Sequence, residues 1–421
     1  MIEGDGNGAF LTPLRWVQAR HGRAATQGGA AVGSGKRFEP GAVDVMFIGL
    51  RSVNGAQGGV ERHVGALVEE FESLGLRTCT VVRHRYAPEG SVQLGRNSFT
   101  QAIWAPRNVS LEAPAHSVLA TLWAGVVRPK VLHVHAIGPS IVVPLARAMG
   151  LRVVCTHHGS DYDREKWGGM AKAVLRFGEW CRGHMANGRI CVSRGLAQSL
   201  SDRFGRQFNY IPNAVNLPRA THSRETLDTF GLEAGEYIVH VGRLVPEKRQ
   251  DDLIRAFARL QRPDLKLVLV GGVDHASAYS KELKALAAAT PGVVMTGFQK
   301  GDALVQLLGN AAVFALPSSH EGMPIAALEA MSPGRPVVLS DIAANMDLGL
   351  PAACYHKVGS VEDLADKIAQ SLDRYGTQDI PAHDWSAVMS SYSWPIVAQQ
   401  TLDVYCDAAP ALQARMAVLS P

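Results

Sequence analysis

The feature that most constrains the fold is a regular alternation of short apolar, β-branched runs with helical segments along nearly the whole chain. In the first half the predicted strands cover residues 43–50, 78–82, 130–136, 152–158 and 189–193. In the second half they cover 237–243, 265–272, 293–298, 313–318 and 336–341. Almost continuously apolar strands that alternate with helices indicate parallel sheets covered on both faces. The chain is therefore predicted to be an α/β protein with two Rossmann-like halves.

The intervening segments have the periodicity of amphipathic helices. After the first strand, one apolar stripe is formed by Val60, Val64, Leu67, Val68, Phe71 and Leu74. Such spacings of three and four residues place side chains on one helix face. Helices are also predicted near 250–260, 279–289, 301–309 and 324–331, and a last one over 391–406.

A chain of 421 residues exceeds what one hydrophobic core usually organises, so two domains are expected. Residues 43–217 and 218–390 are predicted to be these domains, joined near the two prolines of IPNAVNLPR. Residues 1–42 are rich in Gly and Ala and are predicted to be a flexible lead-in. Residues 391–421 are predicted to pack back towards the first domain.

Composition excludes several classes of protein. With 47% hydrophobic and 19% charged residues, the whole chain is not intrinsically disordered. Its six cysteines form no C-x-x-C pair and no cluster with His at zinc-finger spacing, which favours a reducing, cytoplasmic setting. No apolar run is long enough to span a membrane, and the N-terminus does not resemble a secretory signal.

Charge is divided unevenly between the halves. Residues 1–217 hold 25 Lys/Arg and 15 Asp/Glu, a net charge of +10, whereas residues 218–421 hold 17 and 23, a net charge of −6. A basic half predicts an anionic partner for it, such as a membrane surface or a lipid diphosphate. Drift of surface charge without function is the alternative. The basic candidates for this contact are Arg62, Arg83, Arg85, Arg107, Arg128 and Lys130.

Ligands of open parallel sheets bind at the carboxyl ends of the strands, so the cleft between two such sheets is the expected active site. Gly58-Gly59 lies between the first strand and its helix, where glycine permits close backbone approach and helical N–H groups are free. A phosphate or sugar hydroxyl could be received there. The segment lacks G-x-G-x-x-G, and a plain tight turn explains it equally well.

The loop VGRLVPEKR (241–249) carries two cations after a strand. Arg243 ends the predicted strand, and Lys248 is predicted to open the next helix. Two cations at this spacing suit a diphosphate leaving group, whose developing charge they would neutralise. Two solvated surface charges are the alternative interpretation.

The segment SSHEGMPIAALEAM (318–331) carries the sharpest signal. Glu321 lies in a loop after an apolar strand, and Glu329 follows eight positions later in a helix. Pro324 suits the start of that helix, with Gly322 just before it. We interpret Glu321 as a ligand of sugar hydroxyls and the neighbouring amides as phosphate donors.

Together these motifs resemble retaining glycosyltransferases of the large bacterial family 4, which have the GT-B fold. The resemblance extends over about 43–406, and its motifs are GGVERHV (58–64), THHGSDYDREKWG (156–168), IPNAV (211–215), VGRLVPEKR (241–249), E-x7-E within EGMPIAALEAM (321–331) and PVVLSDIAAN (336–345). It implies that the second domain binds a nucleotide-activated sugar and the first binds the acceptor.

Particular roles follow from this resemblance alone. Arg243 and Lys248 would hold the diphosphate, Glu321 the donor sugar and Glu329 the ribose. The other donor-binding positions implied are Gly59, Gly242, Gly322, Met323 and Pro324. His158 matches the family's cleft histidine, although His157 precedes it here. Ala214 stands where the family often has Gly, which would strain a backbone at positive φ.

Two further motifs leave alternatives open. Asp161-Tyr162-Asp163 is a D-x-D that could hold a divalent metal, but we expect Asp161 to shape the acceptor side and no metal to be bound. His133 and His135 share one strand face, where they line the cleft or pack in the core; we favour the core.

The sequence thus predicts a metal-independent, retaining hexosyltransferase without a cofactor. It would move a sugar from a nucleoside-diphosphate donor to a glycan or lipid-linked acceptor in exopolysaccharide, capsule or O-antigen assembly. No nucleic-acid partner is expected. A nucleotide-sugar 2-epimerase and a non-catalytic sugar-nucleotide-binding protein are the alternatives.

Overall fold

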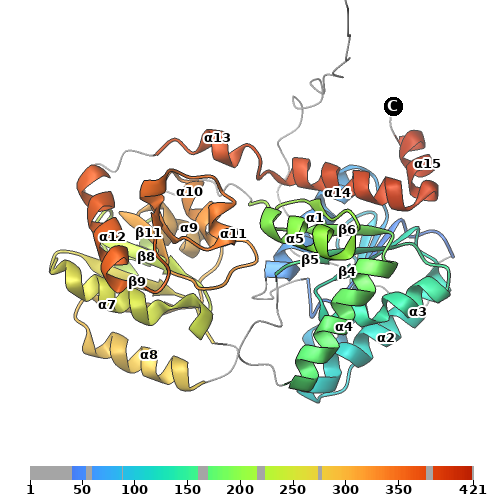
Figure 1. Ribbon diagram of the computed structural model, residues 1–421, viewed down its shortest axis with the longest axis horizontal. Helices are drawn as coiled ribbons and strands as arrows, with labels where there is room; N and C mark the ends of the chain where they lie inside the picture. Colours follow the sequence, from blue (N-terminus) through green and yellow to red (C-terminus); the bar gives the residue numbers. More distant parts are fainter. Residues whose placement is uncertain are drawn as a thin grey trace, which may run out of the picture.

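The structure is a computed structural model, and its backbone is described over residues 40–53, 59–87, 89–159, 169–215, 223–273, 277–375 and 383–419. It forms two α/β lobes that face each other (Figure 1). Most of the predicted lead-in, and Gly58, Asp161 and Asp163, lie outside the described residues.

The first lobe is built on a seven-stranded sheet in the order β3-β2-β1-β4-β5-β6-β7, and neighbouring strands pair in parallel. Its strands are β1 (Val45–Ile48), β2 (Thr78–Arg83), β3 (Ser98–Ile103), β4 (Val131–His135), β5 (Val153–His157), β6 (Gly188–Cys191) and β7 (Asn209–Tyr210). The five predicted strands are present, and β3 and β7 were missed. Both lie at sheet edges, where β3 keeps polar residues and β7 is only two residues long.

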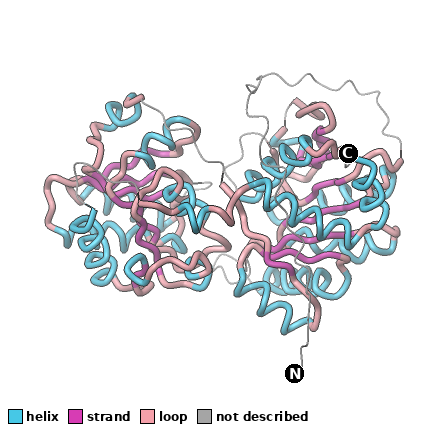
Figure 2. The backbone as a smooth tube through the Cα atoms, turned by 90° about the horizontal axis from the view of Figure 1, so that it is seen from above, coloured by secondary structure: helices cyan, strands magenta, loops and turns pink. Residues whose placement is uncertain are grey.

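Helices cover both faces of this sheet, as the view from above also shows (Figure 2). They are α1 (Gly59–Ser73), α2 (Val109–Val127), α3 (Val143–Ala148), α4 (Gly169–Met185) and α5 (Arg194–Phe204), with 3-10 turns η1 (His84–Tyr86) and η2 (Gly138–Val142). The predicted stripe of α1 is buried from Val64 to Phe71, whereas Leu74 follows the end of the helix and is exposed. Core side chains of α1 lie on one face of the sheet, and those of α2, α3 and α4 lie on the other.

The second lobe has a six-stranded sheet in the order β10-β9-β8-β11-β12-β13, again parallel. Its strands are β8 (Tyr237–Val241), β9 (Lys266–Val270), β10 (Val293–Gly297), β11 (Val313–Leu316), β12 (Val337–Ser340) and β13 (Tyr355–His356). Its helices are α6 (Glu225–Phe230), α7 (Gln250–Leu260), α8 (Ala278–Ala289), α9 (Asp302–Gly309), α10 (Ile325–Met331), α11 (Ala343–Met346) and α12 (Val361–Tyr375), with turns η4 (Pro246–Lys248) and η5 (Ala352–Cys354). The predicted pair of parallel-sheet α/β domains is confirmed.

The C-terminal segment returns to the first lobe. After α13 (Ser386–Met389), helix α14 (Trp394–Ala408) packs against α1, and its Trp394 and Tyr405 join a core cluster with Phe71 (Figure 1). The predicted last helix is followed by a separate one, α15 (Pro410–Leu419). The break lies at Ala409, whose backbone is extended because the residue before a proline disfavours the helical conformation. Within the described ranges, the structure contains no helix that could span a membrane.

Candidate active site between the two domains

The loops after β8 and β11 bring together two residues that the sequence predicts for the donor site, Lys248 and Glu321. Lys248 Nζ lies 2.5 Å from Glu321 Oε1, although 73 positions separate them. Their side chains are 18% and 9% exposed, so the pair is mostly shielded from water. Lys248 ends the turn η4 rather than opening α7, because Arg249 adopts a left-handed conformation before the helix begins. This turn directs the ammonium group towards the β11 loop.

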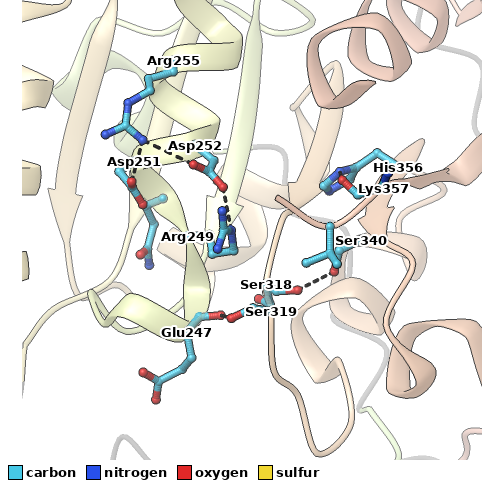
Figure 3. A network of polar contacts seen from close by, with 12 residues as sticks. Glu247, Arg249, Asp251, Asp252, Arg255, Ser318, Ser319, Ser340, His356 and Lys357 are labelled. Carbon is cyan, nitrogen blue, oxygen red and sulfur yellow. Dashed lines mark hydrogen bonds and ion pairs between the residues drawn. The ribbon is translucent and has the colours of Figure 1, made fainter. Parts of the chain in front are cut away.

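Hydrogen bonds to backbone carbonyl groups fix the loops to each other (Figure 3). Ser319 N donates to the carbonyl oxygen of Glu247 at 2.9 Å, next to Lys248 in the chain. Ser340 Oγ, at the end of β12, donates to the carbonyl oxygen of Ser318 at 2.5 Å. Three successive strand ends of the sheet are thus connected, and the Lys248–Glu321 pair is held on a rigid frame.

Gly242, just after β8, lies close to His240, a buried histidine of that strand. Gly242 N donates to Val270 O at 2.9 Å, and a Cβ on Gly242 would lie 3.0 Å from His240 Nε2. Burial lowers the pKa of His240 to about 4, so its ring is neutral at physiological pH. Gln250 Nε2 donates to the carbonyl oxygen of Arg243 at 2.8 Å, which fixes the backbone from which the half-buried Arg243 side chain starts.

Glu329 on α10 meets the other lobe. Its Oε1 lies 2.7 Å from Arg62 Nη1 on α1, so an ion pair crosses the cleft. Burial raises the pKa of Glu329, and Arg62 opposes that shift. From the sequence, Arg62 is a candidate for membrane contact; in the structure its guanidinium is engaged by Glu329, and the membrane contact stays a prediction. No local pattern could have revealed a partner 267 positions away.

The two backbones touch beside this ion pair. A Cβ on Gly322 would lie 1.9 Å from His158 O, and one on Gly159 would lie 3.0 Å from Gly322 Cα. Gly159 has φ +126°, a conformation that L side chains rarely adopt. Asn213 N donates to Met323 Sδ at 2.9 Å, and Pro324 directly precedes α10. Gly322 and Met323 therefore contact the first lobe directly.

The structure distinguishes the two adjacent histidines. His157 is fully buried, and its Nε2 lies 3.4 Å from Glu179 Oε1 on α4. His158 is partly exposed, its carbonyl oxygen meets Gly322, and its Nε2 lies 3.0 Å from His135 Nδ1. Burial, followed by the charges of nearby histidines, lowers the pKa of His158 well below its usual range. Of the two, His158 is thus the one that contacts the other lobe, and its ring is neutral.

His133 and His135 are core residues, as favoured from the sequence, because both are fully buried. His133 Nδ1 lies 2.6 Å from the Tyr405 hydroxyl and its Nε2 lies 2.7 Å from Thr156 Oγ1. His135 connects this core to the cleft through its hydrogen bond with His158. Burial is the main cause that lowers the pKa of both rings, so both are neutral. The neutral His135 ring hydrogen-bonds His158.

A second contact between the lobes was missed from the sequence. Asp347, just after α11, accepts hydrogen bonds from Ser193 Oγ at 2.8 Å and from Arg194 N at 2.7 Å. These groups lie at the N-terminus of α5, where a carboxylate satisfies free N–H groups and the helix dipole. The only signal in the sequence was Ser193 as a helix cap, and the partner is about 150 positions away.

The structure also bears on the predictions for Ala214, for two basic residues of the first lobe and for Gly59. Among the described residues, positive φ outside glycine occurs only at Arg128, Ala136, Arg249 and Gln261, so Ala214 is not strained there. Two more candidates for membrane contact are paired within the first lobe. Arg83 is buried and lies 3.5 Å from Glu112, and Lys130 pairs with Asp44. Gly59 begins α1, and a Cβ there would lie 3.7 Å from Ile325 Cδ1 of the other lobe.

The remaining predicted residue, Asp161, lies outside the described residues together with Asp163. The part of the chain that the structure describes contains no group of three or more His, Cys, Asp or Glu side chains arranged for a metal ion. The D-x-D interpretation therefore stays a prediction.

Two facing Rossmann-like domains, with charged residues on the loops and helices after their strands, define a protein of the GT-B class. The family model for glycosyltransferase family 4 matches residues 57–219, and the model for glycosyl transferases group 1 matches residues 228–383. Between them the two models cover both lobes. The chain belongs to the family-4, group-1 glycosyltransferases.

Individual relatives agree with this assignment. An uncharacterized glycosyltransferase of Methanocaldococcus jannaschii is 34% identical over 177 residues, but the match spans only 40% of this chain and 44% of the relative. The GDP-mannose-dependent alpha-(1-6)-phosphatidylinositol monomannoside mannosyltransferase of Mycobacterium tuberculosis is 27% identical over 82% of this chain and 94% of its own length. HepE of Anabaena, solved in complex with UDP-glucose, shares the fold with a TM-score of 0.70 at 18% identity, over 86% of this chain and 98% of HepE.

Proposed function

We propose that the protein is a retaining glycosyltransferase that moves a sugar from a nucleoside-diphosphate donor to a glycan or lipid-linked glycan acceptor in polysaccharide assembly. The observation that carries this proposal is the pairing of Lys248 with Glu321 in the second lobe, next in the chain to Gly322, whose backbone meets His158 of the first lobe. The mannosyltransferase relative uses GDP-mannose by its name, and HepE was solved with UDP-glucose. Both support a nucleotide sugar as the donor class.

In this proposal the second lobe holds the donor. Arg243 and Lys248 bind the diphosphate, the Glu321 carboxylate accepts hydrogen bonds from the sugar, and Glu329 accepts from the ribose hydroxyls. The backbone of Gly242 and of residues 322–324 approaches the phosphate and sugar. Cations placed where charge develops on the leaving group lower the barrier more than they stabilise the ground state.

The chemical step we propose occurs on one face of the sugar. The bond between the anomeric carbon and the β-phosphate oxygen breaks, and the acceptor oxygen bonds to that carbon from the same side. The departing phosphate oxygen takes the proton of the acceptor hydroxyl, so no protein base is required. In this proposal neutral His158 hydrogen-bonds the donor sugar and carries no charge; its lowered pKa supports this.

Metal independence and the absence of a resident cofactor belong to the same proposal. Arg243 and Lys248 supply the positive charge that a divalent ion would otherwise bring to the diphosphate. We also propose that the first lobe makes peripheral contact with an anionic membrane, on the inner face where a lipid-linked acceptor would be exposed. Asp161 would then lie on the acceptor side of the cleft.

The donor site is tested by calorimetric titration and turnover of two variants. Lys248→Ala should weaken nucleoside-diphosphate binding by roughly tenfold or more, because charge-assisted hydrogen bonds are worth about 1.5–3 kcal/mol. Glu321→Gln keeps the shape and should lower turnover with little change in thermal stability. Lys281→Ala on the exposed face of α8 is the matched control for loss of a charge. Unchanged affinity and turnover in both site variants would refute the assignment.

The donor itself is identified by thermal-shift measurements with UDP, GDP and dTDP, since a ligand that binds only the folded state raises its stability. Incubation with the matching nucleotide sugar alone then separates transferase from 2-epimerase. An epimerised donor without acceptor would favour the epimerase.

A further inference from the structure

Helix α2 of the first lobe has an apolar outer surface. Its one charged residue, Glu112, is buried and lies 3.5 Å from Arg83. The large side chains that point to solvent are all apolar and are 37–70% exposed: Leu111, Val118, Leu119, Leu122 and Val126. A surface helix of a globular protein normally has a polar outer face.

Packing within the fold does not explain this surface. The inner side of α2 already contributes Ala120, Ala124 and Val127 to the core of the first lobe. Leu122 and Val126 are exposed between these positions and are 45% and 70% exposed. Apolar residues on the outer side add nothing to that core, and no other described part of the chain buries them, which is typical of an interaction surface.

Helix α4, which packs on the same face of the sheet, also exposes large apolar side chains. Its exposed residues include Val174, Phe177 and Trp180, and the last two rings stack with centroids 6.1 Å apart. Both helices contact η2 and pack on the same face of the sheet (Figure 1). Trp104, 64% exposed, precedes α2. We call these nine side chains the α2–α4 face: Trp104, Leu111, Val118, Leu119, Leu122, Val126, Val174, Phe177 and Trp180.

This face has a basic border. Exposed Arg107 and Arg128 lie just before and just after α2, and Lys172 and exposed Arg176 lie on α4. The one acidic residue of α4, Glu179, is buried like Glu112. Among the described residues of these two helices, no exposed side chain is acidic. Apolar side chains with interfacial tryptophans and a Lys/Arg border fit the headgroup region of an anionic bilayer.

A second copy of the chain fits less well. In a two-fold dimer the same patch meets itself, so the borders that contain Arg107 and Arg128 would approach each other without acidic partners. Anionic lipid supplies the missing negative charge along the whole border. The charge pattern therefore selects lipid over self-association.

We propose that the α2–α4 face is the surface by which the protein docks on an anionic membrane. This proposal names the surface for the membrane contact in the proposed function. The reason for docking rests on the proposed function, whereas the surface is argued from the exposed residues alone. It replaces the buried or paired candidates Arg62, Arg83 and Lys130 with an apolar contact bordered by Arg107 and Arg128. The two helices follow β3 and β5, so each begins near the carboxyl end of a strand and runs back along the sheet; Trp104 and Leu111 lie at the end nearer the other lobe, and Val126 lies at the far end.

The test is co-sedimentation of the full chain, without donor, with phosphatidylcholine vesicles containing about 30 mol% phosphatidylglycerol. Leu122→Ser/Val126→Ser and Phe177→Ser/Trp180→Ser should each weaken binding about tenfold or more. Part of the binding should be electrostatic and should disappear in about 0.5 M salt. Arg107→Gln/Arg128→Gln should remove most of this salt-sensitive part. The control is Ile396→Ser/Val418→Ser, which alters comparably exposed apolar residues on α14 and α15.

All the changed positions are exposed, so unchanged thermal unfolding shows that each variant is folded. Absence of wild-type binding at low salt, or equal binding by the face variants, overturns the proposal. A concentration-dependent dimer that the face variants abolish also overturns it, in favour of a second copy. Turnover with a water-soluble acceptor is measured separately, so failure of docking and failure of the transferase assignment are distinguishable.

Discussion

Gly322→Ala is the sharpest test of how the two lobes cooperate. In the structure a Cβ at this position would lie 1.9 Å from His158 O and 2.9 Å from His158 C. Carbon–oxygen contacts need at least about 3.3 Å. The two backbones must therefore separate by about 1.4 Å at this point, which is the difference between that contact distance and 1.9 Å.

The size of the effect follows from where the strain can be relieved. The clash lies between lobes rather than inside either core, so a small rigid opening removes it. We expect the free energy of unfolding to fall by less than about 1 kcal/mol. Turnover should fall about 100-fold, because a displacement of about 1 Å between reacting groups has that effect. Affinity for the nucleoside diphosphate should change little, since Lys248 and Arg243 belong to one lobe.

The assay compares kcat, nucleotide affinity by calorimetry and the radius of gyration by X-ray scattering, with and without nucleotide. Gly309→Ala is the matched control, because a Cβ there meets nothing within 4 Å and its φ is not in the left-handed region. Wild-type kcat in Gly322→Ala would show that the contact between His158 and Gly322 is not part of the reactive state.

Three further predictions concern charge, metal and stability. Burial raises the pKa of Glu329 and Arg62 opposes this, so Arg62→Ala should raise it further. In the proposed site the ionised carboxylate accepts the ribose hydrogen bonds, so nucleotide affinity should be lost as the pH falls. In the variant the loss should occur at a higher pH, and titrations across the acidic range check this. EDTA should leave turnover largely intact and Asp163→Asn should be tolerated, whereas loss of activity that manganese restores would support the D-x-D metal site. Tyr405→Phe leaves the buried His133 Nδ1 without its 2.6 Å partner and should cost about 1–3 kcal/mol in urea unfolding.

The sequence was sufficient for the local elements. Ten strands were predicted and all ten are present, because buried parallel strands are apolar throughout and are recognisable without their partners. The strands it missed are short or lie at edges, where polar residues are tolerated and the pattern disappears. Lys248 was misplaced at the start of α7 because the left-handed turn at Arg249 has no signature in a non-glycine residue.

In the candidate site, the residues could be predicted from the sequence but their partners could not. The residue types and their order along the chain were enough to single out Arg243, Lys248, Glu321 and Glu329, since each follows a predicted strand or lies on the helix after it. Their partners were not predictable. That Glu321 faces Lys248, and that Glu329 faces Arg62, depends on how loops 73 and 267 positions apart are brought together by the sheets.

By itself the sequence determined the two parallel-sheet domains and the residue types that gather at their strand ends, because hydrophobic periodicity and turn chemistry act over a few residues. Only the tertiary structure separates His157 from His158, because His157 ends β5 and is buried beside Glu179, whereas His158 follows the strand and meets Gly322 of the other lobe. It likewise decided which arginines are free, since Arg62 and Arg83 find carboxylates on distant elements. Long-range contacts of this kind depend on packing geometry, which no short stretch of sequence encodes.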